Sequence, residues 1–218
     1  MPRALFEKTG NAIWMSHLDL MRLFQRAFKR AGLPLTHTQG FNPRPSVSIA
    51  LPLSVGVESV CELLDFELEG SDDSCDEICT RLNQALVDGV RVRDVYNNGG
   101  KIKNLALLRS IVILEYDNGI PSGAVEQIRE LFSRDSVTVE KKGKNGITQQ
   151  DVIPMLRTVD VREQGREVVM EILACCQNPT LNPMQLSVAI ERYLPELTPD
   201  FAKCRRVEVY DTNENVFR

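Results

Sequence analysis

The sequence predicts an α+β protein of two halves, each with a mostly antiparallel sheet and with helices on one face of it. Strand and helix patterns alternate twice along the chain, and Asn97-Asn98-Gly99-Gly100 between the two series has the composition of a linker. The first series reads β-α-β-β-α-β, which is the ferredoxin-like arrangement. We therefore expect two ferredoxin-like halves in tandem, over residues 1–97 and 101–218.

Hydrophobic spacing places the elements of the first half. A helix starts at Ser16, where Asp19 three residues later resembles a capping box, and it ends at Gly32 before Pro34. Its expected buried stripe consists of Leu20, Phe24, Ala27, Phe28 and Ala31. The other expected elements are strands over residues 3–8 (with Leu5 inward), 46–51, 60–69 and 90–96, and a helix over residues 72–87. Residues 35–38 are expected to form a further short strand, outside the β-α-β-β-α-β order.

The second half repeats the alternation of strands and helices. Its expected strands span residues 105–116, 137–141, 158–162, 167–176 and 205–211. Its expected helices span residues 121–133 and 182–193, with a short helix over residues 148–156. No residue-level repeat relates the two halves, so the predicted duplication depends on the order of the elements alone.

Composition predicts a globular protein of the cytoplasm without a metal or a cofactor. Hydrophobic residues make up 43% and charged residues 26% of the chain. No apolar run approaches the roughly 18 residues of a membrane span, and the first residues lack the apolar core of a signal peptide. The six cysteines form no CxxC pair, and Leu82 stands where a CxxxCxxC motif after Cys75 and Cys79 needs its last cysteine. We expect reduced thiols.

Charge is distributed unevenly along the chain. Residues 1–50 carry a net charge of +5 (seven Lys and Arg against two Asp and Glu). Residues 51–100 carry −8 (three against eleven) and the remainder −1 (sixteen against seventeen), which gives the total of −4. A basic first quarter beside an acidic second quarter can give one molecule two faces of opposite sign.

Residues 16–58 concentrate the polar groups that can act together. Arg22, Arg26 and Arg30 recur every four residues on one face of the first helix. Such a row is either a solvated helix face or a set of phosphate ligands. Its place in the basic quarter of the chain makes it a candidate for binding nucleic acid.

The segment Gln39-Gly40-Phe41-Asn42-Pro43-Arg44-Pro45 predicts a stiff loop. The two prolines restrict the backbone on both sides of Arg44, and Gly40 permits a left-handed turn. Phe41 can stack on a base, Arg44 can bind a phosphate with two hydrogen bonds, and Gln39 and Asn42 can read base edges. The alternative is an ordered connection with Phe41 in the core.

Both histidines lie in the same stretch. His17 or His37 can serve as a general acid or base, as RNA cleavage requires. The alternative is that His17 packs or caps locally, and neither histidine has an evident partner in the sequence. The sequence contains no P-loop, dinucleotide GxGxxG, zincin motif, GxSxG elbow or RNP-type aromatic run, so it identifies no reaction.

Four motifs of this region resemble one bacterial family. SHLDLMR, RAGLP, QGFNPRP and SIALPLSVGVES resemble a domain of unknown function linked to radical-SAM proteins. The resemblance implies a radical-SAM protein as partner, because the domain is fused to a radical-SAM module or encoded beside one. It also implies an association with RNA or the ribosome, because stand-alone members are often encoded near ribonuclease G and ribosomal-protein genes. The chain lacks the cluster motif of a radical-SAM enzyme.

Three hypotheses follow for function. The first is an accessory module that binds RNA or positions an RNA substrate for a radical-SAM partner. It would use Arg22, Arg26, Arg30 and Arg44 for phosphates and Gln39, Gly40, Phe41 and Asn42 for bases or the partner. The second is a metal-independent RNA-processing enzyme, because tandem ferredoxin-like folds occur in CRISPR repeat-processing endoribonucleases of the RAMP superfamily. The third is a protein-binding adaptor that docks through the acidic residues 62–77.

Overall fold

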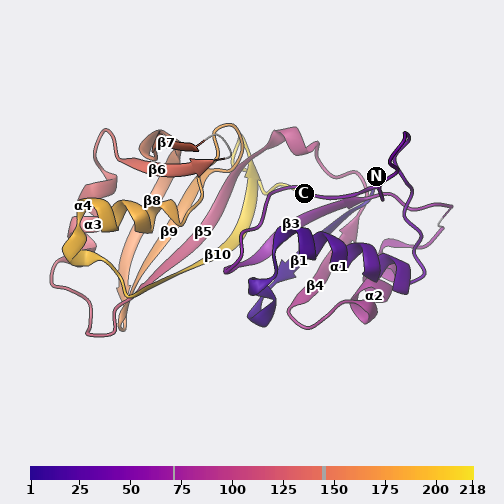
Figure 1. Cartoon of the computed structure of the whole chain (residues 1–218), viewed down its shortest axis with the longest axis horizontal. Helices are drawn as coiled ribbons and strands as arrows, with labels where there is room; N and C mark the ends of the chain where they lie inside the picture. Colours follow the sequence, from indigo (N-terminus) through magenta and orange to yellow (C-terminus); the bar gives the residue numbers. More distant parts are fainter. Residues whose placement is uncertain (71, 144–145) are drawn as a thin grey trace. The chain divides into compact units, whose positions relative to one another are not determined.

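The computed structural model of the protein describes residues 1–70, 72–143 and 146–218. The chain folds into two compact units (Figure 1). Unit 1 consists of residues 1–104 together with residues 217–218, and unit 2 of residues 105–216. The two units are described in turn.

Unit 1 is an antiparallel sheet with two α-helices packed on it (Figure 1). Its elements in chain order are β1 (Arg3–Lys8), η1 (Gly10–Trp14), α1 (His17–Arg30), β2 (Val47–Ile49), β3 (Val57–Phe66), α2 (Cys75–Ala85), β4 (Val90–Tyr96) and η2 (Ile102–Asn104). The strands lie in the order β4-β1-β3-β2, and each pair of neighbours is antiparallel. Ala4 in the middle of β1 lies opposite Leu64 of β3 and Val95 of β4.

The core of unit 1 forms where α1 packs on the sheet. Phe6 of β1 meets Phe24 of α1 edge to face, with the ring centroids 4.8 Å apart. Phe28 of α1 lies 4.9 Å from Phe66 of β3. Burial of these rings determines which faces of α1 and of the two strands point into the core, since aromatic rings bury the most apolar surface of any side chain.

The burial pattern confirms the α1 stripe and corrects the phase of β1. Leu20, Phe24, Ala27 and Phe28 are buried as expected, whereas Ala31 is half-buried at the end of the helix. In β1 the buried residues include Ala4 and Phe6, and Leu5 is only half-buried. The prediction that Leu5 points inward was wrong, because strand residues alternate in facing and the larger Phe6 takes the inner face.

Two further boundaries in unit 1 differ from the expected ones. Residues 35–38 form no strand, only isolated bridges from Leu35 to Leu68 and from His37 to Pro45. The prolines that flank this region supply no backbone donor to a ladder, which also leaves β2 short. The second helix begins at Cys75 rather than at residue 72, because Ser74 and Glu77 form a full capping box.

A Schellman motif ends α1. The backbone N–H of Leu33 donates to the Phe28 carbonyl (2.9 Å) and that of Gly32 to the Lys29 carbonyl (3.2 Å). Gly32 has a φ of +66°, the left-handed conformation that glycine adopts without a steric penalty. The motif brings Leu33 back against Phe28, and both side chains are fully buried.

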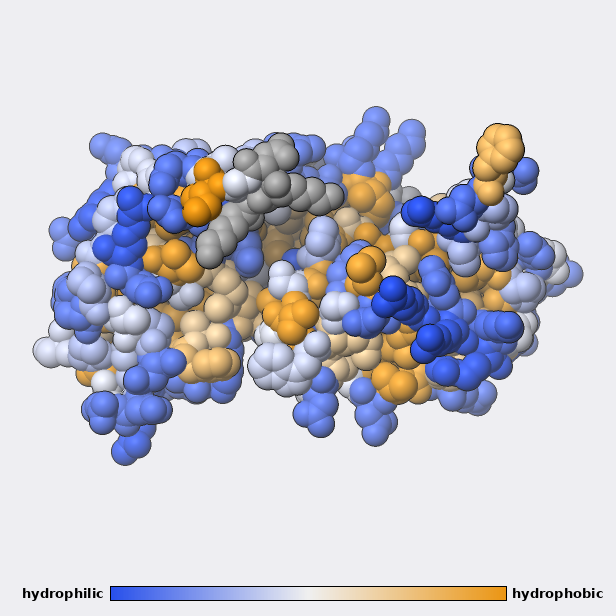
Figure 2. All heavy atoms as spheres, viewed as in Figure 1, coloured by the Kyte–Doolittle hydropathy of each residue, from blue (hydrophilic) through white to orange (hydrophobic). Residues whose placement is uncertain are grey.

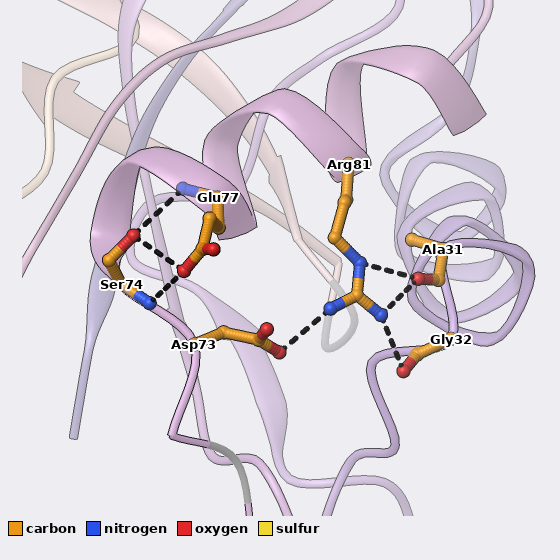
Figure 3. Close-up of polar contacts among 6 residues, drawn as sticks. All are labelled: Ala31, Gly32, Asp73, Ser74, Glu77 and Arg81. Carbon is orange, nitrogen blue, oxygen red and sulfur yellow. Dashed lines mark hydrogen bonds and ion pairs between the residues drawn. The ribbon is translucent and has the colours of Figure 1, made fainter.

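Arg81 of α2 binds this end of α1 (Figure 3). Its Nε donates to the Ala31 carbonyl at 2.9 Å, and its Nη2 donates to the Ala31 and Gly32 carbonyls at 2.6 and 2.8 Å. Its Nη1 donates to Asp73 Oδ2 at 2.8 Å. A cation at a helix C-terminus satisfies carbonyls that lack a partner within the helix. Arg81 therefore fixes the point from which residues 33–45 depart.

Unit 2 consists of four main antiparallel strands, two α-helices and a separate two-stranded hairpin (Figure 1). Its elements are β5 (Leu105–Glu115), α3 (Ala124–Phe132), β6 (Thr138–Gly143), β7 (Gly146–Asp151), η3 (Ile153–Met155), β8 (Leu156–Gln164), β9 (Glu167–Cys175), α4 (Gln185–Tyr193), η4 (Pro195–Leu197) and β10 (Phe201–Asp211). The main strands lie in the order β10-β5-β9-β8, all antiparallel. β6 and β7 pair with each other.

The short helix expected over residues 148–156 was wrong. β7 occupies residues 146–151, with Gln150 opposite Val139 and Asp151 opposite Thr138. The Asp151 carboxylate then turns the chain, since it accepts hydrogen bonds from the backbone N–H groups of Val137 (3.0 Å) and Ile153 (3.1 Å). An aspartate that binds nearby backbone donors favours a turn over a helix interior.

The fold class is α+β, as predicted. The described residues form mostly antiparallel sheets and four α-helices. Within residues 1–70, 72–143 and 146–218, no helix combines the length and the apolar character that crossing a membrane requires.

Candidate nucleic-acid interface

Four basic side chains of α1 are exposed, and three of them, Arg22, Arg26 and Lys29, share its outer face. Successive helical residues are rotated by about 100°, so these positions lie opposite the buried stripe. Figure 2 shows strongly hydrophilic side chains gathered over α1. Unit 1 therefore presents a basic helix to solvent.

Asp19 lies at the start of this face. Its carboxylate accepts hydrogen bonds from the Ser16 hydroxyl (2.6 Å) and from Arg22 Nη1 (3.0 Å). These two contacts, that with Ser16 first, lower the pKa of Asp19. The pair with Arg22 is open to solvent, and exposed ion pairs are weak. Arg22 therefore stays available to a stronger anion such as a phosphate.

Arg30 has a different environment from the rest of its predicted row. Its Nη2 donates to the Ala85 carbonyl at the end of α2. It therefore contacts a helix C-terminus, where a cation is favourable. Arg30 is also exposed, but this hydrogen bond directs its guanidinium toward α2, so Lys29 rather than Arg30 accompanies Arg22 and Arg26 opposite the buried stripe.

Residues 38–44 form a loop closed by its own ends. The Thr38 backbone N–H donates to the Arg44 carbonyl at 2.9 Å, and the Arg44 N–H donates to Thr38 Oγ1 at 3.0 Å. Phe41 is fully exposed between them, so the alternative of a core position does not apply. Gly40 has a φ of +131°, a conformation that favours glycine.

The base of this loop is held by backbone hydrogen bonds. Ser46 N–H donates to the Thr36 carbonyl (2.8 Å), Thr36 N–H to the Glu67 carbonyl (2.9 Å), and Glu67 N–H to the Ser46 carbonyl (3.1 Å). Three chain segments are thereby tied together below the loop. The remaining loop side chains with predicted roles, Gln39, Asn42 and Arg44, are all exposed.

A hollow of about 360 Å³ lies between α1 and the loop base. Its walls come from the helix, the loop base and the segment after β3, and the lining residues are Gln25, Phe28, Lys29, Leu33, Pro34, Leu35, His37, Pro45 and Glu69. The helix and the loop therefore converge on one concavity. Of the predicted site residues, His37 lines it.

Sequence reasoning missed three polar residues of this hollow, Gln25, Lys29 and Glu69. Lys29 had a signal, because it shares the solvent face of α1 with Arg22 and Arg26. Glu69 had no such signal, because it is distant in sequence from the helix and the loop. The hydrogen bond from its N–H to the Pro34 carbonyl (2.9 Å) holds it beside the hollow.

The two histidines do not share a site. His37 lines the hollow, whereas His17 is the first residue of α1, about 12 Å from Gln25 along the helix axis. His17 Nδ1 is buried and has no hydrogen-bond partner among the described residues. The structure thus brings together no acid–base pair from His17 and His37.

The acidic stretch 62–77 is inaccessible only in its strand part, because Glu67, Glu69, Asp72, Asp76 and Glu77 are all exposed. Glu62 is 2% exposed within β3. Asp65 binds the buried Arg3 through two contacts, 2.5 Å to Nε and 3.1 Å to Nη2. Arg3 also stacks on Phe217 at 5.4 Å. The strand part of the predicted adaptor surface is therefore an internal network.

The cysteines are free thiols, and among the described residues no group of three or more His, Cys, Asp or Glu side chains could hold a metal ion. Cys79 Sγ contacts the Val92 carbonyl at 3.7 Å, and burial raises the pKa of this thiol. Cys75 Sγ accepts a hydrogen bond from Asn97 Nδ2 at 3.5 Å, so both cysteines of α2 have contacts of their own.

Exposed apolar side chains gather at the other end of unit 1. Trp14 of η1, Leu18 of α1 and Val55 are 62%, 66% and 53% exposed. The Gly56 N–H donates to the Ile13 carbonyl (2.8 Å), and a Cβ on Gly56 would lie 3.6 Å from the Trp14 ring. Below them Lys8 is fully buried, and its Nζ donates to the Met15 and Ser54 carbonyls at 2.9 and 3.4 Å. Trp14, Leu18 and Val55 therefore form an apolar patch over backbone that the buried Lys8 holds in place.

Comparison with known families identifies the chain. The model of a bacterial family described as "Uncharacterized protein conserved in bacteria (DUF2344)" matches residues 2–183. The chain belongs to this family. The match includes the basic face of α1, the loop and the hollow. No curated protein matches the chain.

Solved structures show likeness in fold only. A chain of the "Crystal Structure of a Cbf5-Nop10-Gar1 Complex" matches 95% of this chain with 10% identity and a TM-score of 0.50. The protein described here spans 48% of the length of that chain of the complex. An unknown protein from Galdieria sulphuraria matches 94% of this chain and 97% of its own, with 13% identity and a TM-score of 0.26, too low to bear on the fold.

Proposed function

We propose that this protein is a cytoplasmic accessory module whose unit 1 binds single-stranded RNA. The supporting observation is that Lys29 of the basic face of α1 and the base of the Phe41 loop line the same hollow. A cationic surface and an exposed aromatic side chain around one concavity are the parts that single-strand binders combine.

Each part has a separate task in this proposal. Arg22 and Arg26 bind backbone phosphates, and Arg44 offers a planar guanidinium that can form two hydrogen bonds to a phosphate. Phe41 stacks on a base. A fully exposed ring on a projecting loop needs an unpaired base, so the ligand is a single strand rather than a duplex.

The topology supports a tandem origin of the scaffold. In each unit the first strand lies between the third and the fourth, and the second strand pairs with the third. This order, with β-α-β-β-α-β connections, is that of a ferredoxin-like fold. We assign both units to it, with β6 and β7 as an insertion in unit 2.

Binding of the full chain to a fluorescent RNA of mixed sequence, about 12 nucleotides long, tests the proposal. Anisotropy is measured from about 50 to about 300 mM salt. The double variant Arg22→Ala/Arg26→Ala should bind more weakly and reduce the slope of log affinity against log salt by about 1.4, since each single-strand phosphate contact contributes about 0.7. Lys101→Ala/Lys103→Ala removes the same charge from exposed positions away from the hollow and should bind like the wild type.

The contribution of stacking is tested separately. Phe41→Ala should lose about 1–3 kcal/mol, or roughly five- to 150-fold in affinity. Phe201→Ala removes an exposed phenylalanine of unit 2 and serves as the control. RNA affinity that is absent, insensitive to salt, or unchanged in the α1 variant contradicts the proposal.

The apolar patch favours a second candidate function, docking of a protein partner. Trp14 and Leu18 are large, exposed apolar side chains four residues apart in the chain, as expected of an interaction site. The partner in this proposal is the radical-SAM protein that the family resemblance implies, with RNA presented to it by unit 1. Direct titration of the purified partner should give an affinity that ribonuclease leaves unchanged and that Trp14→Ala lowers, with the unit 2 variant Phe201→Ala as control.

A further inference from the structure

The hollow between α1 and the loop base has an apolar floor. Phe28 and Leu33 are fully buried there, held together by the Schellman motif, and Leu35 continues the floor. The rings of His37 and Pro45 stand in the wall, at residues that bridge to each other. Phe28 and Leu33 have no accessible surface of their own, so the faces open to a planar ring are those of Leu35, His37 and Pro45.

Three polar side chains at the hollow are unengaged. In the part of the chain that the structure describes, the side chains of Gln25, Lys29 and Glu69 have no hydrogen-bond or ion-pair partner. An ionised carboxylate only accepts hydrogen bonds, an ammonium only donates them, and an amide does both. A ligand that meets Glu69 and Lys29 together must therefore present donors to one and an acceptor to the other.

Building on the RNA-binding role, we propose that this hollow is a guanine-selective base pocket. The Watson–Crick edge of guanine carries two adjacent donors, N1–H and N2–H, and an acceptor, O6. The Glu69 carboxylate accepts from the two donors, and the Lys29 ammonium donates to O6. Lysine donation to the O6 and N7 acceptors of guanine is a frequent mode of base recognition.

The other bases mismatch the same pair of side chains. Adenine and cytosine each present one amino donor beside a ring nitrogen that carries a lone pair. In the hollow this lone pair faces the Glu69 carboxylate and is repelled by it. Uracil presents one N–H between two carbonyl oxygens. Glu69 and Lys29 are exposed in the free protein, so a base that covers them without supplying the matching partners adds a desolvation cost to the mismatch.

The dimensions and position of the hollow agree with a base. A volume of about 360 Å³ lies at the lower end of small-ligand pockets. Glu69 is fixed across from α1 by the hydrogen bond from its N–H to the Pro34 carbonyl. Since His37 leads directly into the Phe41 loop, a nucleotide in the hollow places its neighbour within reach of the exposed ring.

Two ligand sets test the inference with the full chain. The first is GMP, AMP, CMP and UMP, titrated by calorimetry, which share one phosphate and differ in the base. The second is a uridine-rich RNA with one central guanine, adenine, cytosine or uracil. GMP and the guanine RNA should bind at least about tenfold more tightly than the others. In Glu69→Gln this preference should fall to about twofold or less, because the amide adds donors where guanine has donors. Glu191→Gln on the exposed side of α4 should retain it.

The outcomes separate the pocket from the function. RNA binding without any preference for guanine overturns the guanine pocket and leaves RNA binding in place. Selective binding of GMP without binding of any RNA supports the pocket and overturns the RNA-binding role. Four monophosphates that bind alike or not at all, together with RNAs that do not discriminate, overturn the pocket.

Discussion

Replacing Arg81 by Met tests whether the end of α1 depends on a side chain of α2. Arg81 donates to the Ala31 and Gly32 carbonyls and to Asp73, at 2.6–2.9 Å (Figure 3). Methionine keeps the apolar stem and removes all of these contacts. Because the segment that leaves α1 here builds the hollow, the effect should reach the site as well as the stability.

The magnitude follows from the exposure of the contacts. A hydrogen bond to a charged group contributes about 1.5–3 kcal/mol when buried. The Arg81 side chain is 34% exposed, so water can replace part of what it gives, and the pair with Asp73 adds about 1 kcal/mol or less. We expect a loss of about 2–3 kcal/mol in the free energy of unfolding of unit 1, which is less than the sum of the individual hydrogen bonds if each were fully buried.

The assay is urea denaturation followed by two signals. Emission of Trp14, the single tryptophan, reports on unit 1, and circular dichroism reports on both units. Comparing the two signals shows whether the two units unfold in one transition or in two, so a single transition need not be assumed. Arg93→Met is the matched control, because Arg93 makes an exposed pair with Glu7, worth about 0.5 kcal/mol or less. Equal losses in both variants, or a loss below about 0.5 kcal/mol in Arg81→Met, would refute the reasoning.

Three other predictions concern unit stability and thiol chemistry. Lys8→Met should lower the unfolding free energy of unit 1 by about 3 kcal/mol in the same urea assay, because two carbonyls lose a buried charged donor; a smaller change than in Arg93→Met contradicts this. The Ser74 backbone and hydroxyl lower the pKa of Glu77, so its stabilising contribution is present above the ordinary pKa of 4.5 and is lost as pH falls. Glu77→Gln should flatten the decline of unit 1 stability on acidification, and an unchanged slope would contradict the capping role. Burial raises the pKa of Cys204 to about 12, so mass spectrometry after alkylation should find Cys75 modified in the folded protein and Cys204 only after unfolding; early labelling of Cys204 would contradict its burial.

Local signals in the sequence predicted most of α1. The Ser16 cap, the buried stripe and the stop at Gly32 all depend on residues within one helix length. Ser74-x-x-Glu77 carried the same kind of signal for α2, although the acidic residues before it suggested an earlier start. Capping is local chemistry, so it can be read from a single sequence.

Strand phase and strand existence were harder to predict. Leu5 and Phe6 are both apolar, and only packing against Phe24 decides which one faces the core. Residues 35–38 have strand-forming side chains but meet their neighbours through isolated bridges. β7 exists because β6 lies beside it, which a helical spacing over residues 148–156 does not reveal.

The hollow was the least predictable feature. Gln25 and Lys29 come from a helix, His37 and Pro45 from a loop base, and Glu69 from the end of a strand. Only the β3–loop pairing and the Schellman turn bring them together. The sequence pointed to the surrounding region through Phe41 and the arginines, but not to the concavity itself.

The closure of residues 38–44 separates the tip of the loop from its support. The closing hydrogen bonds use the backbone of Thr38 and Arg44 and one hydroxyl, so they do not depend on which side chains lie between. Residues 39–43 at the tip can therefore be exchanged without loss of the closing hydrogen bonds. A new recognition sequence can be grafted there without rebuilding the hollow at the loop base.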